Sequence, residues 1–251
     1  MVSAGDSANF TQAGFHTTQW NLVLASAQSD DVAGADDALD DLCRSYWSPL
    51  YAFARRRGKS PPDAQDAVQG FFLHFIETRA FARADPQRGR FRSFLLGSFI
   101  RFMASEWERS HTQKRGGNWE MISIDVNLIE ANGWPELTTA ATPERAFEER
   151  WALTVVERAM AQLAAGAEAR GKIAAFAAAR PYLTGEGRAE SYQETATALG
   201  LGLGAWKTLI HRLRREFGTL LRREVARTLF DPTEVDAELR HLRGVLADIL
   251  P

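Results

Sequence analysis

The sequence predicts an all-α protein with two helical domains, an N-terminal bundle and a C-terminal helix-turn-helix domain, joined by an irregular linker. Three observations support this prediction. Apolar residues recur every three or four positions through most of the chain. A glycine near position 200 separates two short helical patterns, and residues 116–144 are rich in Gly, Asn, Pro and Thr.

The N-terminal part starts with residues 1–16, which we expect to form a tail. They lack the basic start and apolar stretch of a secretory signal. Residues 17–28 follow as a short predicted helix. A longer helix is predicted over 36–57, where Pro49 can bend or divide the element. Its expected core residues are Leu39, Leu42, Tyr46, Leu50 and Phe53.

Two more helices complete the first predicted domain, residues 17–115. Asp63 opens the first of them, where its charge complements the helix dipole. A basic loop at 79–90 precedes the second, residues 91–115, in which aromatic and cationic residues alternate. Such interleaving suits single-stranded nucleic acid, but most of these rings are expected to be core, and Trp107 is the exception. The core candidates before the loop are Val68, Phe71, Phe72 and Phe75.

An acidic linker is predicted over 116–142, and the second domain over 143–229. Pro143 after Thr142 marks the start of a helix. That helix is expected to direct its apolar residues towards the second domain, and a further helix is expected near 168–180. The apolar residues in question are Phe147, Trp151, Leu153 and Val155.

Residues 191–225 carry the clearest motif, two helices around a glycine turn. Ser191 and Glu194 form a capping box, and Gly200 can end the first helix in a left-handed conformation. The second helix is expected to start near Leu203, with the apolar residues Trp206, Ile210, Leu213 and Phe217 on one stripe. Cations that lie off this stripe can reach phosphates and base edges together, although a solvated surface hairpin would show the same pattern.

The last segment, 230–251, looks like one added helix. Asp231, Pro232 and Glu234 form its start signal. Its apolar stripe must pack on the C-terminal domain, pack on the N-terminal domain, or bind a regulator. The stripe consists of Val235, Leu239, Leu242 and Leu246.

Composition indicates a soluble cytoplasmic protein without a membrane span. The single cysteine, Cys43, excludes an internal disulfide and fits a reducing compartment. The net charge of −2 hides segregation, because residues 51–115 carry thirteen Lys or Arg against six Asp or Glu, whereas residues 116–150 carry two against seven. Separated basic blocks suggest two surfaces that face nucleic acid.

Three segments together resemble sigma factors of the extracytoplasmic-function (ECF) group in the sigma-70 superfamily. DAQDAVQGFFLHF is similar to the segment that docks on core RNA polymerase, FRSFLLGSFIRFMASEWER to the helix that melts DNA, and SYQETATALGLGLGAWKTLIHRLRR to the C-terminal helix-turn-helix. TTQWNLVLASAQ and DPTEVDAELRHL also look like a long-chain subgroup with a C-terminal helical extension. The resemblance implies a partner in core RNA polymerase, promoter DNA as the ligand, and no cofactor.

The resemblance also assigns site residues. The polymerase-binding positions are Asp63, Asp66, Gln69 and Phe72, and Gln65 stands where the family usually has an acid. The positions for the downstream promoter element and melting are Arg83, Arg88, Arg90, Arg101, Trp107, Arg109, His111, Lys114 and Arg115. The positions for the upstream element are Lys207, Thr208, His211, Arg212 and Arg215. Gly202, Thr195 and Trp206 depart from the family pattern in this unit.

Three readings therefore stand after the sequence alone. The first is a sigma factor that recognises a two-part promoter. Its regulator would be an anti-sigma factor or a protein kinase, and no motif in the sequence decides between them. The second is a stand-alone helix-turn-helix regulator. The third is a helical adaptor that binds polymerase or a kinase without reading DNA. An enzyme is not expected, because we find no Gly-rich phosphate loop, metal-ligand cluster or nucleophile–base arrangement in the sequence.

Overall fold

A computed structural model describes residues 35–85, 90–112, 142–184 and 192–249 of the 251-residue chain. Every regular element in these ranges is helical, which confirms the all-α prediction. The expected tail, the expected helix at 17–28 and nearly all of the expected linker lie outside the described residues. None of the described helices is long and apolar enough to cross a bilayer.

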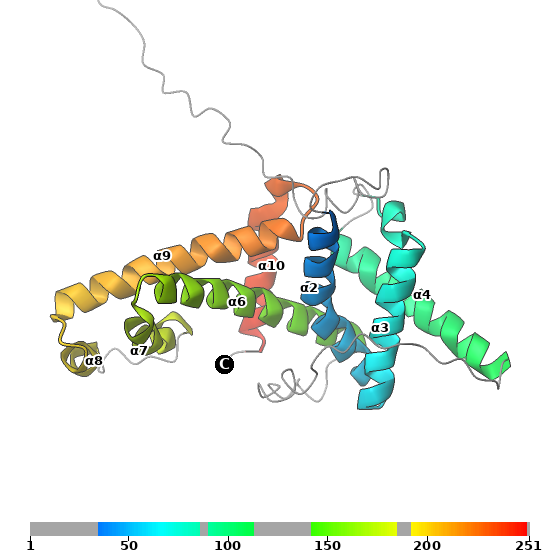
Figure 1. The fold of residues 1–251 in the computed structure, drawn as a ribbon, viewed down its shortest axis with the longest axis horizontal. Coiled ribbons are helices and arrows are strands. Elements are labelled where there is room, and N and C mark those ends of the chain that lie inside the picture. Colours follow the sequence, from blue (N-terminus) through cyan, green and yellow to red (C-terminus); the bar gives the residue numbers. More distant parts are fainter. Residues whose placement is uncertain (1–34, 86–89, 113–141, 185–191, 250–251) are drawn as a thin grey trace, which may run out of the picture.

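The N-terminal bundle consists of α2 (Ala35–Arg56), α3 (Pro61–Glu77) and α4 (Phe91–Thr112), with the short 3₁₀ turn η1 (Ala80–Arg83) between the last two (Figure 1). Helix α2 runs through Pro49 as one element. Phe71 of α3 occupies the centre of the bundle, with its ring 5.1 Å from that of Phe99 and 5.8 Å from that of Phe102 on α4. Edge-to-face pairs of this kind add to the free energy gained from apolar burial.

The C-terminal half is built on two long helices that lie side by side, α6 (Pro143–Ala169) and α9 (Leu203–Arg227) (Figure 1). Helices α7 (Ile173–Thr184) and α8 (Tyr192–Ala198) pack at one end of this pair. Thr142 caps α6 by accepting a hydrogen bond from the backbone N–H of Arg145 at 3.2 Å. The sequence expectation of a helix start at Pro143 is therefore confirmed.

The expected helix near 168–180 starts later than predicted, at Ile173. Helix α6 continues to Ala169, and Gly171 then adopts a left-handed φ of 66°. The N–H of Lys172 bonds the carbonyl of Ala167 at 2.8 Å, which closes the end of α6. The glycine, which the sequence reading passed over, sets the boundary between the two helices.

The buried residues of α6 do not follow the expectation that they face the second domain. Phe147, Trp151 and Val155 belong to the same apolar cluster as the core of α2, α3 and α4. A second cluster, around Leu163 and Trp206, joins the end of α6 to α7, α8 and the start of α9. Helix α6 therefore contributes to both cores, one along each part of its length.

The C-terminal extension forms α10 (Val235–Ala247), preceded by the 3₁₀ turn η4 (Pro232–Glu234). It crosses α6 and α9 and packs against both (Figure 1). Val235, Leu242 and Val245 are buried in the first cluster, and Leu239 and Leu246 pack at its edge. The apolar stripe is thus covered by the chain itself, at the junction of its two halves.

Candidate functional site

Helix α3 begins with a reciprocal cap that involves the first expected docking residue. Ser60 accepts a hydrogen bond from the N–H of Asp63 at 3.3 Å, and the Ser60 hydroxyl donates to the Asp63 carboxylate at 2.5 Å. Asp63 is exposed, but its carboxylate already serves the helix start. The capping role and a docking role are compatible, because a carboxylate accepts several hydrogen bonds.

The exposed side of α3 is partly apolar. Leu73 is 46 % exposed and Ile76 is 39 % exposed, on the face opposite the buried stripe of this helix. Asp66 and Gln69 lie on the same face, because positions 66, 69, 73 and 76 are three and four residues apart. Phe72, by contrast, is only 7 % exposed and belongs to the core. We call Asp66, Gln69, Leu73 and Ile76 the α3 face.

The sequence reading missed Leu73 and Ile76, although a signal for them was present. The buried stripe of α3 already accounts for its other large apolar residues. Leu73 and Ile76 fall outside that stripe, where an apolar side chain gains nothing from the chain's own core. Exposed aliphatic residues beside a carboxylate are typical of a surface that binds another protein.

The basic segment after α3 is partly engaged within the protein. Arg83, at the end of η1, is exposed. Arg90 lies at the start of α4, and its Nε is 3.1 Å from a carboxylate oxygen of Glu238 in α10. Its side chain is 36 % exposed, whereas that of Glu238 is 1 % exposed. Arg88 lies outside the described residues.

Along α4 the aromatic residues divide as expected between core and surface. Phe99 is fully buried, whereas Trp107 is 62 % exposed. Arg101 is exposed and donates a hydrogen bond to the Ser98 hydroxyl at 3.0 Å. The positions of Arg109 and His111 fall in the last turns of α4, where side chains are not among those described. Lys114 and Arg115 lie outside the described residues.

The helix-turn-helix is formed by α8 and the start of α9. Gly200 has φ 66°, and the N–H of Leu201 bonds the carbonyl of Ala196 at 2.9 Å. The N–H of Gly200 also bonds the carbonyl of Thr197 at 3.0 Å. This pair of bonds is a Schellman motif, and it confirms the expected glycine stop. Ser191 lies outside the described residues, so its expected capping role remains a prediction.

The outer face of α9 carries all the residues expected at the upstream element. Lys207, Thr208, His211, Arg212 and Arg215 are exposed, whereas Trp206, Ile210 and Leu213 are buried. The hydroxyl of Thr208 donates to the carbonyl of Gly204 at 2.9 Å, so it is already engaged in part. The structure therefore brings these five side chains together on one exposed surface, which we call the α9 face.

Thr195 and Trp206, two of the residues noted above as departures from the pattern, both contact Tyr182. The Tyr182 hydroxyl and the Thr195 hydroxyl are 3.0 Å apart, so the polar side chain of Thr195 is satisfied inside the unit. The Tyr182 ring packs edge-on against that of Trp206 at 5.8 Å. Arg214 donates to the Tyr182 carbonyl at 2.8 Å. Through Tyr182 these contacts join α7 to α8 and α9.

A buried arginine ties the start of α4 to α6 and α10. Arg92 is 4 % exposed, and its Nε donates to both carboxylate oxygens of Glu148, at 2.9 and 3.1 Å. Its guanidinium also lies 4.3 Å from the Trp151 ring centre and forms an ion pair with Glu238. Burial lowers the pKa of Arg92, and the charge of Glu148 opposes that shift.

The pKa of Glu148 reflects the same arrangement from the other side. Burial alone would raise it, but the charge of Arg92 and a hydrogen bond with His241 outweigh burial and lower it. The Nε2 of His241 is 2.9 Å from the second carboxylate oxygen of Glu148. Glu148 therefore stays ionised between α4 and α10.

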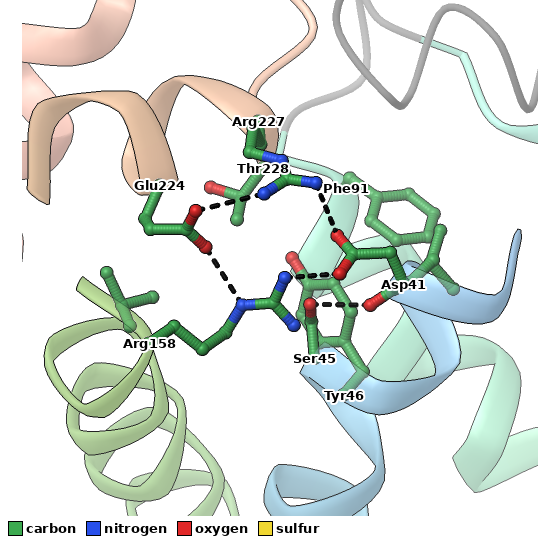
Figure 2. A pocket seen from close by; sticks show the side chains of 10 residues that line it. Asp41, Ser45, Tyr46, Phe91, Arg158, Glu224, Arg227 and Thr228 are labelled. Carbon is green, nitrogen blue, oxygen red and sulfur yellow. Dashed lines mark hydrogen bonds and ion pairs between the residues drawn. The ribbon is translucent and has the colours of Figure 1, made fainter. Parts of the chain in front are cut away.

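A second charged cluster joins α2, α6 and α9 (Figure 2). Arg158 bonds Glu224 at 2.9 Å and also Asp41, while Arg227 bonds Glu224 at 3.0 Å and lies 3.0 Å from Asp41. The four side chains thus form a closed ring of alternating charge. The cavity beside them measures about 30 Å³, room for a water molecule or so and far smaller than a substrate site.

Comparison with known proteins identifies the N-terminal bundle. Residues 42–111 match the Sigma-70 region 2 family. The match spans most of α2, all of α3 and nearly all of α4, and it contains the α3 face, Arg90 and Trp107. No curated protein and no solved structure is similar enough to add a relative.

Region 2 is the part of a sigma factor that binds RNA polymerase and takes part in promoter melting, so core polymerase and promoter DNA are the partners of this family. The exposed α3 face and the exposed Trp107 lie on the helices that the match covers. Residues 42–111 are therefore similar to region 2 of the sigma-70 family of RNA polymerase sigma factors, and this match supports the assignment of the chain to that family.

Proposed function

We propose that the chain is an ECF-type sigma factor that acts in the cytoplasm, docks on core polymerase through the α3 face and recognises a two-part promoter. Residues around Arg83, Arg101 and Trp107 would contact the downstream element and the melted strand. The α9 face would contact the upstream element. The predicted division into a region 2 domain and a helix-turn-helix domain is part of this proposal.

The observation that carries promoter recognition is the α9 face. A row of side chains at helical spacing stands exposed on the second helix of a helix-turn-helix, with Trp206, Ile210 and Leu213 buried behind it and Phe217 partly buried. A second helix placed in this way enters the major groove in other proteins. Lysine and arginine there supply phosphate contacts and can read guanine.

The observation that supports docking is the mixed character of the α3 face. Leu73 and Ile76 provide apolar area, and Asp66 provides an exposed charge beside them. A partner surface that buries these residues would be apolar at its centre and basic at its edge. The resemblance implies such a surface on the large subunit of core polymerase.

The direct test is transcription in vitro with sigma-free core polymerase and a library of promoter fragments. We expect transcripts with defined starts that depend on the protein. The double variant Asp66→Ala/Leu73→Ala should lose binding to core. Ile173→Ala is the matched control for the apolar truncation, because Ile173 is 48 % exposed but lies on α7.

Promoter recognition is tested separately with Lys207→Ala and Arg212→Ala. Loss of a phosphate contact should lower the salt dependence of promoter binding by about one unit in the log–log slope. Lys172→Ala removes the same charge from an exposed position at the start of α7 and should leave promoter binding unchanged. The measurement is affinity of the polymerase–sigma complex for promoter DNA over a range of salt concentrations.

Two results would replace this proposal with its rivals. Specific duplex binding without any association with core would favour a stand-alone regulator. Binding to core, together with an activity that Lys207→Ala and Arg212→Ala leave unchanged, would favour an adaptor. An anti-sigma factor or a kinase remains the proposed kind of regulator, to be identified by partners that release or modify the core-bound protein.

A further inference from the structure

Helix α10 buries one charged residue within its apolar stripe. Val235, Leu242 and Val245 are buried against the rest of the chain, and Glu238 is buried among them at 1 % exposure. A buried carboxylate costs free energy unless its surroundings satisfy it, so an apolar residue would serve packing better at this position. The residues that Glu238 contacts therefore indicate the role of its negative charge.

Those partners are two arginines at the start of α4. One oxygen of Glu238 is 3.1 Å from Nε of Arg90, and the other forms an ion pair with Arg92. Arg92 has a second, well-directed partner in Glu148, whereas Arg90 forms its ion pair with Glu238. Arg90 is also one of the cations that the resemblance assigns to promoter DNA.

Each oxygen of Glu238 faces one arginine, whereas Glu148 holds Arg92 with both of its oxygens. Neither oxygen of Glu238 has a partner in hydrogen-bond geometry among the described residues. Arg92 and Glu148, by comparison, meet in a bidentate arrangement. A single contact between one carboxylate oxygen and one guanidinium nitrogen is easier to break than a bidentate pair, because less favourable interaction is lost.

Arg90 is within reach of a competing ligand. Its side chain is 36 % exposed while it is paired with Glu238, so a phosphate can reach the guanidinium from solvent and then displace the carboxylate. A guanidinium group binds carboxylate and phosphate oxygens by the same geometry. Glu238 and a DNA phosphate are therefore alternative partners of one side chain.

We propose that α10 is an autoinhibitory element in which Glu238 occupies Arg90 and lowers the affinity of the region 2 surface for DNA. The inference rests on the proposed function, because it takes Arg90 as part of the DNA-binding surface. It goes beyond that function by giving the C-terminal extension a role. Thermodynamic linkage makes the competition reciprocal: bound DNA weakens the hold of α10 on α4 by the same factor.

The test compares Glu238→Gln with Asp236→Asn in the full chain. Both substitutions remove one negative charge from α10, but Asp236 is exposed and pairs with Arg222 at 2.6 Å, away from Arg90. The probe is a fluorescein-labelled single-stranded DNA oligonucleotide of mixed sequence, and binding is followed by anisotropy over a range of salt concentrations. Arg90→Ala is then added to Glu238→Gln.

We expect Glu238→Gln to tighten binding by about three- to tenfold and to steepen the salt dependence by about 0.7, the slope of one phosphate contact on a single strand. Asp236→Asn should stay within about twofold of the unaltered protein, since an exposed charge is screened. Arg90→Ala should cancel the gain. Equal affinities for Glu238→Gln and Asp236→Asn would overturn the proposal, as would a gain that survives Arg90→Ala.

A second measurement uses the unaltered protein, so the proposal does not depend on the folding of a variant. Amide hydrogen exchange in residues 235–247 should accelerate when saturating DNA is added. Unchanged protection of α10 in the DNA complex would overturn the proposal. The transcription assay separates the two ideas: transcription with no effect of Glu238→Gln on DNA binding rejects autoinhibition alone, and no transcription rejects the sigma function itself.

Discussion

Replacing Arg92 with methionine should destabilise the protein strongly, because it leaves two carboxylates without their shared cation. Arg92 is 4 % exposed and bonds Glu148 through both of its oxygens. Methionine keeps much of the side-chain length but removes the charge. Breaking a buried ion pair by removing one partner costs about 3–5 kcal/mol, so we expect the free energy of unfolding to fall by that amount at pH 7.

The loss should shrink as the pH falls. The pKa of Glu148 is lowered in the folded protein, so its ionised form contributes stability above its unfolded pKa, and that contribution disappears as the pH falls through the folded pKa. In the methionine variant Glu148 keeps only His241 and Glu238 keeps only Arg90, and the loss of the Arg92 charge favours the protonated forms of both carboxylates. The difference between the two proteins should therefore be largest near pH 7 and smaller near pH 4.

The assay is urea unfolding followed by circular dichroism at both pH values. Arg101→Met is the matched control, because Arg101 is exposed on the same helix, and it should change the free energy of unfolding by less than about 0.5 kcal/mol. A loss below about 1 kcal/mol for Arg92→Met, or a loss that does not depend on pH, would refute this account of the ion pair.

Three further outcomes follow from local geometry. Gly200→Ala should lower the free energy of unfolding by about 1–2 kcal/mol, because Gly200 has a left-handed φ of 66°. Gly218→Ala should raise it by about 0.5–1 kcal/mol, because Gly218 lies within α9 and a Cβ there meets open space. Chemical denaturation measures both changes. Burial raises the pKa of Cys43 to about 12, so its thiol should react slowly with iodoacetamide at pH 8 until urea unfolds the chain. Tyr182→Phe should lower the free energy of unfolding by about 1 kcal/mol, and adding Thr195→Val should lower it little further, because each substitution removes the same hydrogen bond. Additive losses of stability in thermal melts would contradict this.

The features that the sequence could predict are those with local causes. The left-handed stop at Gly200, the cap at Thr142 and the start of α9 at Leu203 each depend on a few adjacent residues. The buried stripe of α9 follows from spacing alone. The exposed α9 face could therefore be named from the sequence, and the structure places every one of its members at the surface.

The features that the sequence could not predict depend on residues far apart in the chain. Arg92 meets Glu148, which is 56 residues away, and a charged residue at such a position would ordinarily be expected at the surface. Phe147 and Trp151 were expected to face the second domain. They pack instead on the first cluster, a choice between two apolar surfaces that periodicity alone cannot make.

The same limit applies to the candidate docking residues. Phe72 was assigned to the docking surface from its place in the motif, but its side chain is buried, and Leu73 and Ile76 are exposed in its stead. Helical spacing distinguishes two faces of α3 but does not decide how wide the buried one is. That width is set by α2 and α4, which pack against it.

The sharing of α6 between two cores has a consequence for exchanging parts between related proteins. A chimera joined at residue 142 would keep the region 2 match and the helix-turn-helix whole, yet it would separate Phe147, Trp151 and Val155 from the α2 surface that they complete. In the chimera, the α2 surface and the apolar face of α6 would each lose the partner that they pack against in this chain. Moving the C-terminal half into a related protein should therefore require the recipient's α2 surface to be redesigned with it. The segment that must be exchanged to keep the fold is then longer than the helix-turn-helix proposed to contact DNA.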